Sequence, residues 1–196
     1  MHLMQIEAIY QKPNLSKANS EHKIYPYLLR NKPIEAVNHV WSTDITYVPM
    51  KSGFLYLCAV VDWYSRFILS WEVSNTLAVD FCLRALQTAF DNWGSPQIFN
   101  TDQGSQFTSP TFTEKLSNKQ IQISMDGRGR ALDNVFIERF WRTLKYEHIY
   151  LHEYADGHSL YEGLLAFIQF YNYERKHQAL AYLTPAQVYL LNQGFP

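Results

Sequence analysis

The sequence predicts a mixed α/β domain built on one sheet, and the order of its apolar patterns is the main reason. Three runs rich in valine, isoleucine and aromatic residues follow one another over residues 41–74, with short turns between them. Two shorter apolar runs then alternate with helical patterns, and further helical patterns close the chain. Antiparallel strands, then strands alternating with helices, then helices are typical of a mixed α/β domain with one sheet.

The first three runs are expected to form an antiparallel meander. Each run is enriched in the residue types that favour strands, and the turns between them lie at residues 49–53 and 63–66. We expect the strands at Trp41–Val48, Phe54–Asp62 and Phe67–Ser74.

The pattern then changes from strand to helix. Thr76 precedes apolar residues spaced three or four apart, so we expect it to cap a helix that runs to Asn92, before the helix-breaking sequence Gly94-Ser95-Pro96. The later elements are expected, in chain order, as a strand at Gln97–Asn100, a helix at Pro110–Asn118, a strand at Ile121–Ser124, a helix at Asp133–Tyr150 and two final helices at Ser159–Lys176 and Pro185–Leu191.

Composition limits the class of protein. The chain has 196 residues, 47% of them hydrophobic, which is enough for one domain and a short attachment and excludes a disordered polar tail. A formal net charge of -1 gives no overall basic signature of a nucleic-acid-binding protein. The longest apolar run, Phe54–Val61, is far shorter than the roughly 18 residues of a membrane span, so we expect no membrane segment. Cys58 and Cys82 lie in apolar patterns, and we expect both in a core, in a reducing compartment.

Charge is segregated along the chain. Residues 10–33 contain three prolines and five basic residues against the single acidic residue Glu21. We therefore expect residues 1–36 to form an extended basic linker that leads into a domain at residues 37–196. Composition alone fits an ordinary solvated loop about equally well.

Two aspartates stand out because of where they lie relative to the expected strands. Asp44 is in the middle of the first strand, where a carboxylate is unfavourable unless it is paired or bound to a metal ion. Asp102 follows the strand Gln97–Asn100 closely, and Gly104 two residues later lets the backbone turn sharply and approach a ligand. Both positions are typical of functional carboxylates.

A third carboxylate, Glu138, lies on the long helix. At about 100° per residue, its side of the helix also carries Asn134, Arg142 and Lys145. Apolar residues occupy the opposite side, namely Phe136, Ile137, Phe140 and Leu144. A solvated helix face gives such a mixture often enough that this helix alone decides nothing.

Together the three carboxylates favour a site for divalent metal ions. Two unit charges ~4 Å apart at an effective dielectric constant near 20 repel by ~4 kcal/mol, and divalent cations remove that penalty. Oxygen ligands without a His/Cys cluster favour Mg²⁺ or Mn²⁺ over zinc. Two such ions ~3.5–4 Å apart are a known arrangement for in-line displacement at phosphorus.

With these residues in place, the sequence resembles a known family over nearly its whole length. It is similar to the core of DDE transposases, and most of all to the second-frame product of the insertion-sequence-three family, relatives of retroviral integrases. The 35 residues between Asp102 and Glu138 match the spacing of that family. The segments that carry the resemblance are WSTDITY at 41–47, TDQGSQF at 101–107, DN at 133–134, ERFW at 138–141, LK at 144–145, YNYERKHQAL at 171–180 and TP at 184–185.

The resemblance implies a ribonuclease-H-like fold, with a mixed five-stranded sheet flanked by helices and extra C-terminal helices. It also implies a DNA transposase in which water, and then a DNA 3′-hydroxyl, attacks phosphodiester bonds without a covalent protein intermediate. Asp44, Asp102 and Glu138 would be its catalytic residues and would hold Mg²⁺ or Mn²⁺, as two ions.

The resemblance extends to partners. Lys145 matches the basic position of the family and is expected to contact DNA. We add further DNA contacts from charge and proximity, at Asn134, Arg128, Arg130 and Arg142. The implied partners are the ends of a mobile element, target DNA and further copies of the chain, in the cytoplasm of a bacterium and without a membrane.

The sequence also departs from the family. Ala181 stands where glycine is usual and Lys176 where proline is frequent, which bears on the packing of the C-terminal part. Family members carry a helix-turn-helix before the core, and Met1 begins after it, so we expect a chain truncated at its N-terminus. Two alternatives therefore remain: an idle DNA-binding or oligomerisation fragment that interferes with full-length transposase, and a metal-dependent nuclease that cuts without joining.

Other polar and aromatic residues have plainer interpretations. Asp62, at the end of the second strand, is expected to form a turn by bonding to nearby backbone. His177 and Arg175 either approach DNA or close the C-terminal helices onto the core. An aromatic stripe on the long helix is expected to pack in the core, at Phe136, Phe140 and Trp141.

Overall fold

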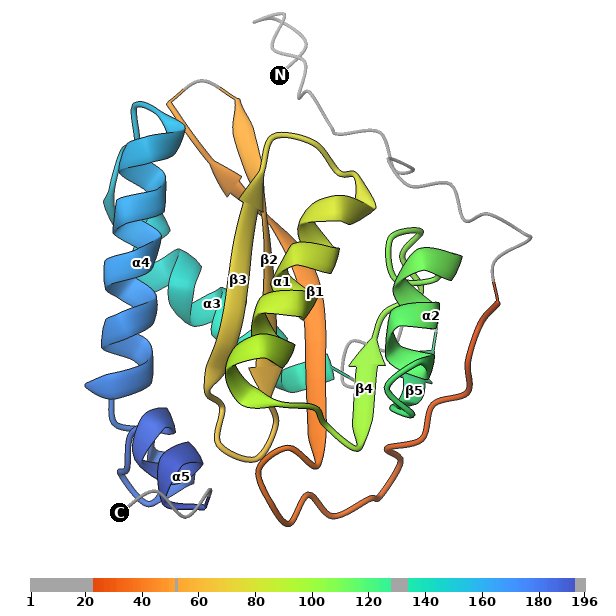
Figure 1. The fold of residues 1–196 in the computed structure, drawn as a ribbon. Helices are drawn as coiled ribbons and strands as arrows, with labels where there is room; N and C mark the ends of the chain where they lie inside the picture. Colours follow the sequence, from red (N-terminus) through yellow and green to blue (C-terminus); the bar gives the residue numbers. More distant parts are fainter. Residues whose placement is uncertain (1–22, 52, 128–133, 193–196) are drawn as a thin grey trace, which may run out of the picture.

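Five strands form one mixed sheet in the order β3-β2-β1-β4-β5 (Figure 1). The structure is a computed structural model that describes residues 23–51, 53–127 and 134–192. β1 pairs antiparallel with β2 and parallel with β4, while β2 pairs antiparallel with β3, and β4 pairs parallel with β5. The strands are β1 (Val40–Pro49), β2 (Phe54–Asp62), β3 (Ile68–Ser74), β4 (Ile98–Thr101) and β5 (Gln122–Met125). The expected meander and the two later strands are confirmed.

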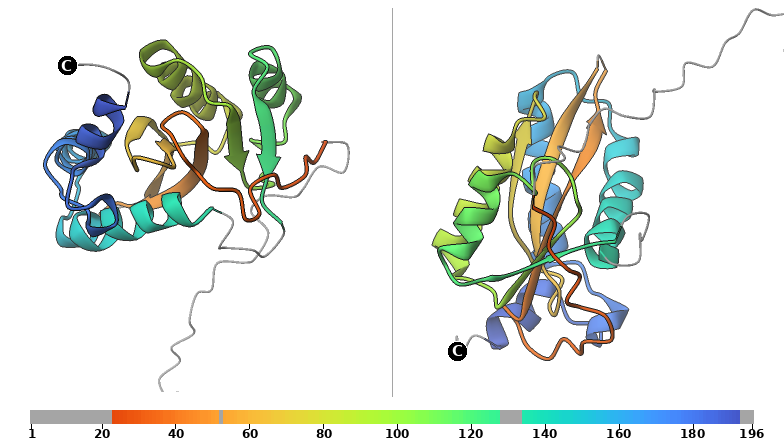
Figure 2. Two further views of the ribbon diagram at one scale, coloured as in Figure 1. Left: turned by 90° about the horizontal axis from the view of Figure 1, so that it is seen from below. Right: turned by 90° about the vertical axis from the view of Figure 1, so that its right-hand side faces the viewer.

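Helices cover both faces of the sheet (Figure 2). α1 (Val79–Trp93), α2 (Pro110–Ser117) and α5 (Pro185–Leu191) contribute to one buried apolar cluster. α3 (Val135–Glu147) and α4 (Gly157–Tyr173) contribute to a second cluster on the other face. Because the sheet is buried on both sides, its central strands carry near-continuous apolar runs, as in the middle of β2.

Local capping explains most helix starts, and one expectation was wrong. Ser109 caps α2, and Asp156 and Thr184 form capping boxes at the starts of α4 and α5. Thr76 does not cap α1, which begins at Val79 after an Ala78 that makes no side-chain cap bond. The Thr76 backbone N–H instead bonds to the Ser74 hydroxyl at 3.0 Å, so the threonine belongs to a local turn.

The C-terminal half differs in detail from the expected helices. The expected helix 133–150 is shorter: α3 ends at Glu147, and a separate 3-10 turn follows at Ile149–Leu151. Ala181, which stands where the family usually has glycine, has a φ of 54°, in the left-handed region that favours glycine. This conformation costs an alanine about 1–2 kcal/mol of backbone strain.

Part of the expected basic linker packs on the domain. Leu29 is buried in the cluster that contains α3 and α4. The Leu28 backbone N–H bonds to the Ser124 hydroxyl at 3.1 Å, and the Met125 N–H bonds to the Pro26 carbonyl at 3.4 Å. The segment therefore runs beside β5. None of the helices in the described ranges is long and apolar enough to cross a membrane.

Three residues that the sequence singled out, one aspartate and two cysteines, are buried. The Asp62 carboxylate forms the expected turn, because it accepts the backbone N–H of Ser65 at 2.8 Å and that of Asn38 at 2.8 Å. Cys58 and Cys82 are both buried in the core, as expected.

Asn172 attaches α4 to the edge strand β3. Its side chain accepts the Ile68 backbone N–H and donates to the Ile68 carbonyl, both at 2.9 Å. The side-chain amide thus takes the place of a neighbouring strand at this point of the sheet edge. Asn172 is almost completely buried, so water does not compete for these bonds.

We predict that Asn172→Ala lowers the free energy of unfolding by about 2–4 kcal/mol, because it leaves a buried N–H and a buried carbonyl of Ile68 without their partner. Urea unfolding measures the change. Asn92→Ala, at an exposed position of α1, is the matched control and should stay within about 0.5 kcal/mol of the unsubstituted protein. Equal losses in the two variants would contradict this role of Asn172.

Candidate active site

The register of β1 and β4 brings two of the predicted carboxylates together. The two strands run parallel, with Ser42 opposite Asn100. Continued by two residues, this register places Asp44 opposite Asp102, the first residue after β4. Neighbouring strands lie about 4.8 Å apart, so the two backbones hold these aspartates side by side at the end of β4.

The pKa of Asp44 responds to its burial and to the charge of Asp102. The pKa of Asp44 is raised from 3.8 to about 7; burial is the largest cause, and the negative charge of Asp102 acts in the same direction. Two hydrogen bonds, from the Trp141 side chain and the Ile45 backbone, act to lower that pKa, and the charge of Glu138 adds a smaller increase. Asp44 therefore stands where a negative charge is costly and a nearby cation would be favourable.

Asp102 lies in the turn that the sequence predicted. Its Oδ1 accepts the Gly104 backbone N–H at 2.8 Å. A Cβ on Gly104 would lie 2.9 Å from the same oxygen, so only glycine fits this close approach without a shift. The residue is reached by solvent, yet its carboxylate has lost part of its water, which raises the pKa of Asp102.

Helix α3 crosses β1 beside this pair. The Trp141 indole N–H donates to Asp44 Oδ2 at 2.9 Å, and the Asn134 side chain donates to the Thr43 carbonyl at 3.4 Å. Trp141 and Phe140 are buried, as expected, whereas Phe136 is half-buried against Trp63. Sequence reasoning missed the contact of Trp141 with Asp44, although its position three residues after Glu138 places it toward the same side of the helix.

Glu138 is exposed in the first turn of α3, where loss of part of its water raises its pKa. Within the described ranges, no three side chains of His, Cys, Asp or Glu lie close enough together to hold a metal ion. The structure thus brings Asp44 and Asp102 together, and the charge of Glu138 acts on Asp44 more weakly than that of Asp102. That Glu138 completes a three-carboxylate site remains a prediction.

The predicted basic residues fall into three groups. Lys145 is half-buried, and loss of water lowers its pKa while the charge of Asp44 raises it, so this ammonium group is within electrostatic reach of Asp44. Arg142 is exposed on α3. Arg128 and Arg130 lie outside the described residues.

One carboxylate near the site was missed by sequence reasoning. Asp126 follows β5 directly, in the register that places it opposite Asp102. Its Oδ1 accepts a hydrogen bond from the Asn100 side chain, and its carbonyl accepts one from Gln103, both at 2.8 Å. The Gln103 bond ties the loop that contains Asp102 to the residue after β5, and the Asn100 bond ties β4 to the same residue.

Comparison with known proteins identifies the family. Two descriptions of the integrase core domain match this chain, one over residues 35–131 and the other over residues 119–185. The transposase for insertion sequence element IS904 of Lactococcus lactis is 36% identical over 155 residues, which cover 76% of this chain and 60% of that protein. The chain belongs to the integrase core family of insertion-sequence transposases.

A second relative of this integrase core chain is the transposase InsF for insertion sequence IS3A of Escherichia coli strain K12. It is 31% identical over 153 residues, which cover 76% of this chain and 53% of that protein. The chain therefore spans a little more than half the length of the curated relatives it matches. Their names agree with the insertion-sequence family that the motifs predicted.

Solved structures confirm the ribonuclease-H-like fold of this integrase core. A chain of the simian T-cell lymphotropic virus intasome, in complex with PP2A regulatory subunit B56 gamma, matches with a TM-score of 0.71 at 20% identity, over 92% of this chain and 64% of that chain. The HTLV-2 integrase catalytic core domain, in complex with magnesium, matches with a TM-score of 0.59 at 20% identity, over 79% of this chain and 97% of that chain.

The raised pKa of Asp44 predicts a pH-dependent stability. A carboxyl group whose pKa is about 7 in the folded protein and near 3.8 when unfolded disfavours folding progressively as the pH rises from about 4 to 7. In EDTA, Asp44→Asn should therefore raise the free energy of unfolding by about 2–4 kcal/mol at pH 8 and leave it nearly unchanged at pH 4.

Urea unfolding at the two pH values measures this difference. The same change at the exposed Asp91, on α1, is the control, because a carboxylate in water has no burial cost to relieve. A loss of stability at pH 8 in Asp44→Asn would contradict the electrostatic description of the site.

Proposed function

We propose that this chain is the catalytic core of a DNA transposase that cleaves phosphodiester bonds and transfers strands during the integration of a mobile element. The observation that carries the proposal is the parallel pairing of β1 with β4, which ends at Ser42 and Asn100 and so leaves Asp44 and Asp102 two residues beyond it, with the pKa of Asp44 raised to about 7 by burial and by the charge of Asp102. The family membership and the insertion-sequence relatives support the same conclusion.

The donor atoms fit a hard divalent cation. Asp44, Asp102 and Glu138 offer only carboxylate oxygens, the ligands that Mg²⁺ and Mn²⁺ prefer. A positive charge between Asp44 and Asp102 would offset both the repulsion between them and the cost of burying Asp44. We therefore propose these three residues as the ligands of two such ions, which would supply activation of the attacking oxygen and stabilisation of the leaving oxygen.

The protein's own contribution is to hold the carboxylates in fixed orientations. Trp141 fixes Asp44 Oδ2 from α3, and the Gly104 N–H fixes Asp102 Oδ1 from the loop after β4. Preorganised ligands lower the cost of assembling the reactive arrangement, because no reorientation is needed when substrate binds. In this scheme water, and then a DNA 3′-hydroxyl, attacks the phosphodiester directly, and no protein side chain forms a covalent bond to DNA.

DNA is the proposed substrate and partner. Lys145 and Arg142 on α3, and Asn134 directly before it, would contact its phosphates near the carboxylates, as would Arg128 and Arg130, which lie outside the described residues. A structural neighbour belongs to a viral intasome, which supports the proposal that further copies of this chain assemble on DNA.

We predict metal-dependent cleavage and joining by the purified chain, given Mg²⁺ or Mn²⁺ and a branched DNA that mimics a transfer product. Asp102→Asn should lower both rates by about 100-fold or more, because it removes a charged metal ligand. Asp91→Asn is the matched control and should leave the rates unchanged. Gel analysis of labelled strands separates cleaved from joined products.

The possible results distinguish the proposed transposase from its alternatives. Cleavage without joining would identify a nuclease. Absence of both reactions, with DNA binding retained, would identify a non-catalytic DNA-binding fragment. Equal rates in Asp102→Asn and in the unsubstituted chain would contradict the assignment of the carboxylates.

A further inference from the structure

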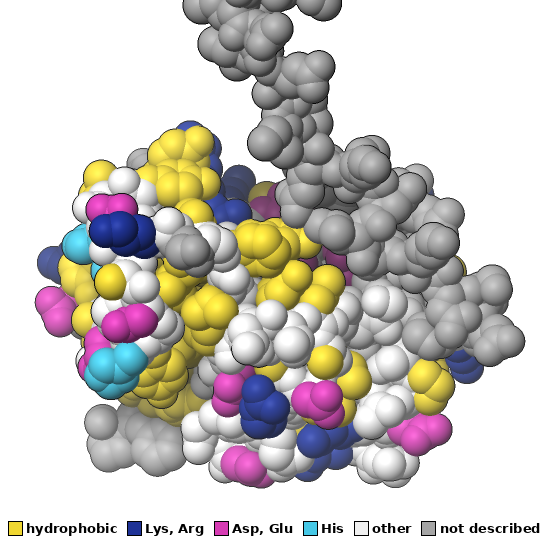
Figure 3. All heavy atoms as spheres, turned by 90° about the horizontal axis from the view of Figure 1, so that it is seen from above, with side chains coloured by type: hydrophobic (Ala, Val, Ile, Leu, Met, Phe, Trp, Pro, Cys, Tyr) yellow, Lys and Arg dark blue, Asp and Glu magenta, His cyan; other side chains and the backbone are white. Residues whose placement is uncertain are grey.

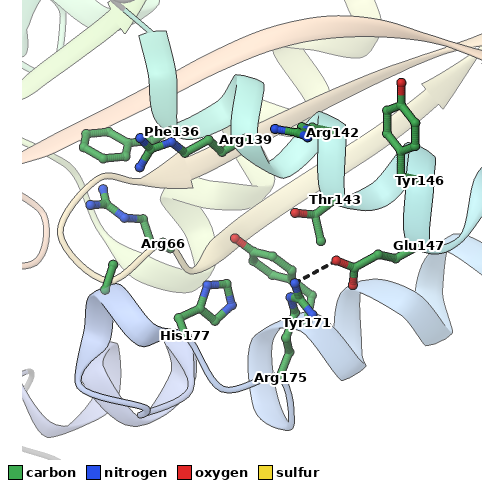
Figure 4. A pocket seen from close by; sticks show the side chains of 11 residues that line it. Arg66, Phe136, Arg139, Arg142, Thr143, Tyr146, Glu147, Tyr171, Arg175 and His177 are labelled. Atoms are coloured by element: carbon green, nitrogen blue, oxygen red, sulfur yellow. Dashed lines mark hydrogen bonds and ion pairs between the residues drawn. The ribbon is translucent and has the colours of Figure 1, made fainter.

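A pocket of about 580 Å³ lies on another face of α3, between this helix, the end of α4 and the turn before β3 (Figure 4). One acidic residue, Glu147, lines it. Four arginines line it as well: Arg66, Arg139, Arg142 and Arg175. On the face of the molecule seen from above, basic and acidic side chains are instead interspersed (Figure 3). The pocket therefore has a local excess of positive charge, with four arginines against one glutamate.

The charges in the pocket are incompletely neutralised. Arg175 pairs with Glu147 at 2.8 Å, but its buried Nε has no hydrogen-bond partner among the described residues. Arg66 lies over the ring of Phe136, 3.3 Å from its centre, and donates to the Trp63 carbonyl. Loss of water lowers the pKa of Arg66 to about 10, and the positive charge of Arg139 lowers it in the same direction.

His177 adds a second buried nitrogen to the same wall. Its ring packs edge-on against Tyr171, and its buried Nε2 has no partner within the described part of the chain. Burial lowers the pKa of His177 to about 4, and repulsion by Arg175 and Arg66 acts in the same direction. At neutral pH the ring is therefore uncharged and keeps one N–H that can be donated to an anion.

Arg66 also has an uncommon backbone conformation. Its φ of 66° lies in the left-handed region, which is costly for a residue with a long side chain. Such conformations concentrate at functional sites, where the surrounding structure holds them in place. Here the conformation belongs to the residue whose guanidinium group lines the pocket from the β2–β3 turn.

We propose that this pocket binds a phosphate of the DNA backbone, held by Arg66, Arg139 and Arg175 with His177, outside the carboxylate site. Guanidinium groups bind phosphate oxygens through paired hydrogen bonds, which the unpartnered Arg175 Nε would complete. That the phosphate belongs to DNA rests on the proposed function, whereas the negative charge of the ligand is inferred from the arginines of the pocket itself.

Two features favour a DNA strand over a free anion or an acidic peptide. Arg142 is one helical turn after Glu138, so α3 joins the pocket to the carboxylate side over about 6 Å, close to the length of one nucleotide. Tyr146 lines the pocket and is 67% exposed, and its ring meets the exposed Tyr150 edge-on. Exposed aromatic rings beside a phosphate site are suited to stacking on bases.

The test measures binding of a labelled duplex oligonucleotide by fluorescence anisotropy in EDTA, over a range of salt concentrations. Arg139→Gln should weaken binding about 3- to 10-fold and should lower the magnitude of the salt slope by about 0.9, the loss of one phosphate contact. Arg84→Gln is the matched control, since this arginine lies on α1, where it pairs with Glu72, and both quantities should stay unchanged.

A second variant changes affinity in the opposite direction, which a folding defect cannot imitate. Glu147→Gln removes the acidic residue of the pocket and frees Arg175, so DNA should bind about threefold more tightly, with a steeper salt dependence. Glu72→Gln breaks the comparable ion pair with Arg84 and should leave the affinity unchanged.

Several results would overturn the proposal. They are no binding of DNA by the unsubstituted chain, identical behaviour of Arg139→Gln and Arg84→Gln, and no tightening in Glu147→Gln. Displacement of the oligonucleotide by millimolar inorganic phosphate at constant ionic strength would indicate a site for a free anion and would also contradict it. Because binding is measured without metal ions, failure of the pocket leaves the Asp102→Asn result intact, and failure of the catalytic assignment leaves the pocket result intact.

Discussion

The parallel pairing of β1 with β4 is the constraint on which the site depends. Backbone pairing fixes the register at Ser42 and Asn100, and Asp44 and Asp102 each follow two residues later, close enough for the charge of Asp102 to raise the pKa of Asp44. Two carboxylates are thus held together by the sheet itself, against their mutual repulsion. Burial of the central strands between two apolar clusters stabilises the sheet and offsets this repulsion.

Helix α3 links the sheet to the rest of the site because its different faces contact different parts of the protein. One side is buried, and Trp141 on it reaches Asp44. Glu138 and Lys145 lie toward the carboxylates, while Arg139 faces the basic pocket. The same helix can therefore position groups for chemistry and for DNA binding, and a small rotation of it would disturb both.

Strand patterns predicted much of this architecture, since β1 to β3 are long runs of residues that favour strands and are separated by turn residues. Asp44 and Asp102 were found for the same local reason, as polar residues at unusual strand positions. The prediction that Thr76 caps a helix was wrong because the Ser74 hydroxyl, two residues earlier, accepts the Thr76 backbone N–H. Residue propensity does not tell which of two nearby hydroxyls bonds to the backbone. Arg66, Arg175 and His177 meet in one pocket only through tertiary packing, which no spacing in the sequence reveals.

The most direct test of the central claim is the anomalous scattering of crystals of this chain grown with Mn²⁺. Our description predicts anomalous density within about 2.2 Å of carboxylate oxygens of both Asp44 and Asp102, with Glu138 as a further ligand, and loss of that density in Asp102→Asn. Ordered Mn²⁺-grown crystals without density beside either aspartate, or with undiminished density in Asp102→Asn, would contradict it.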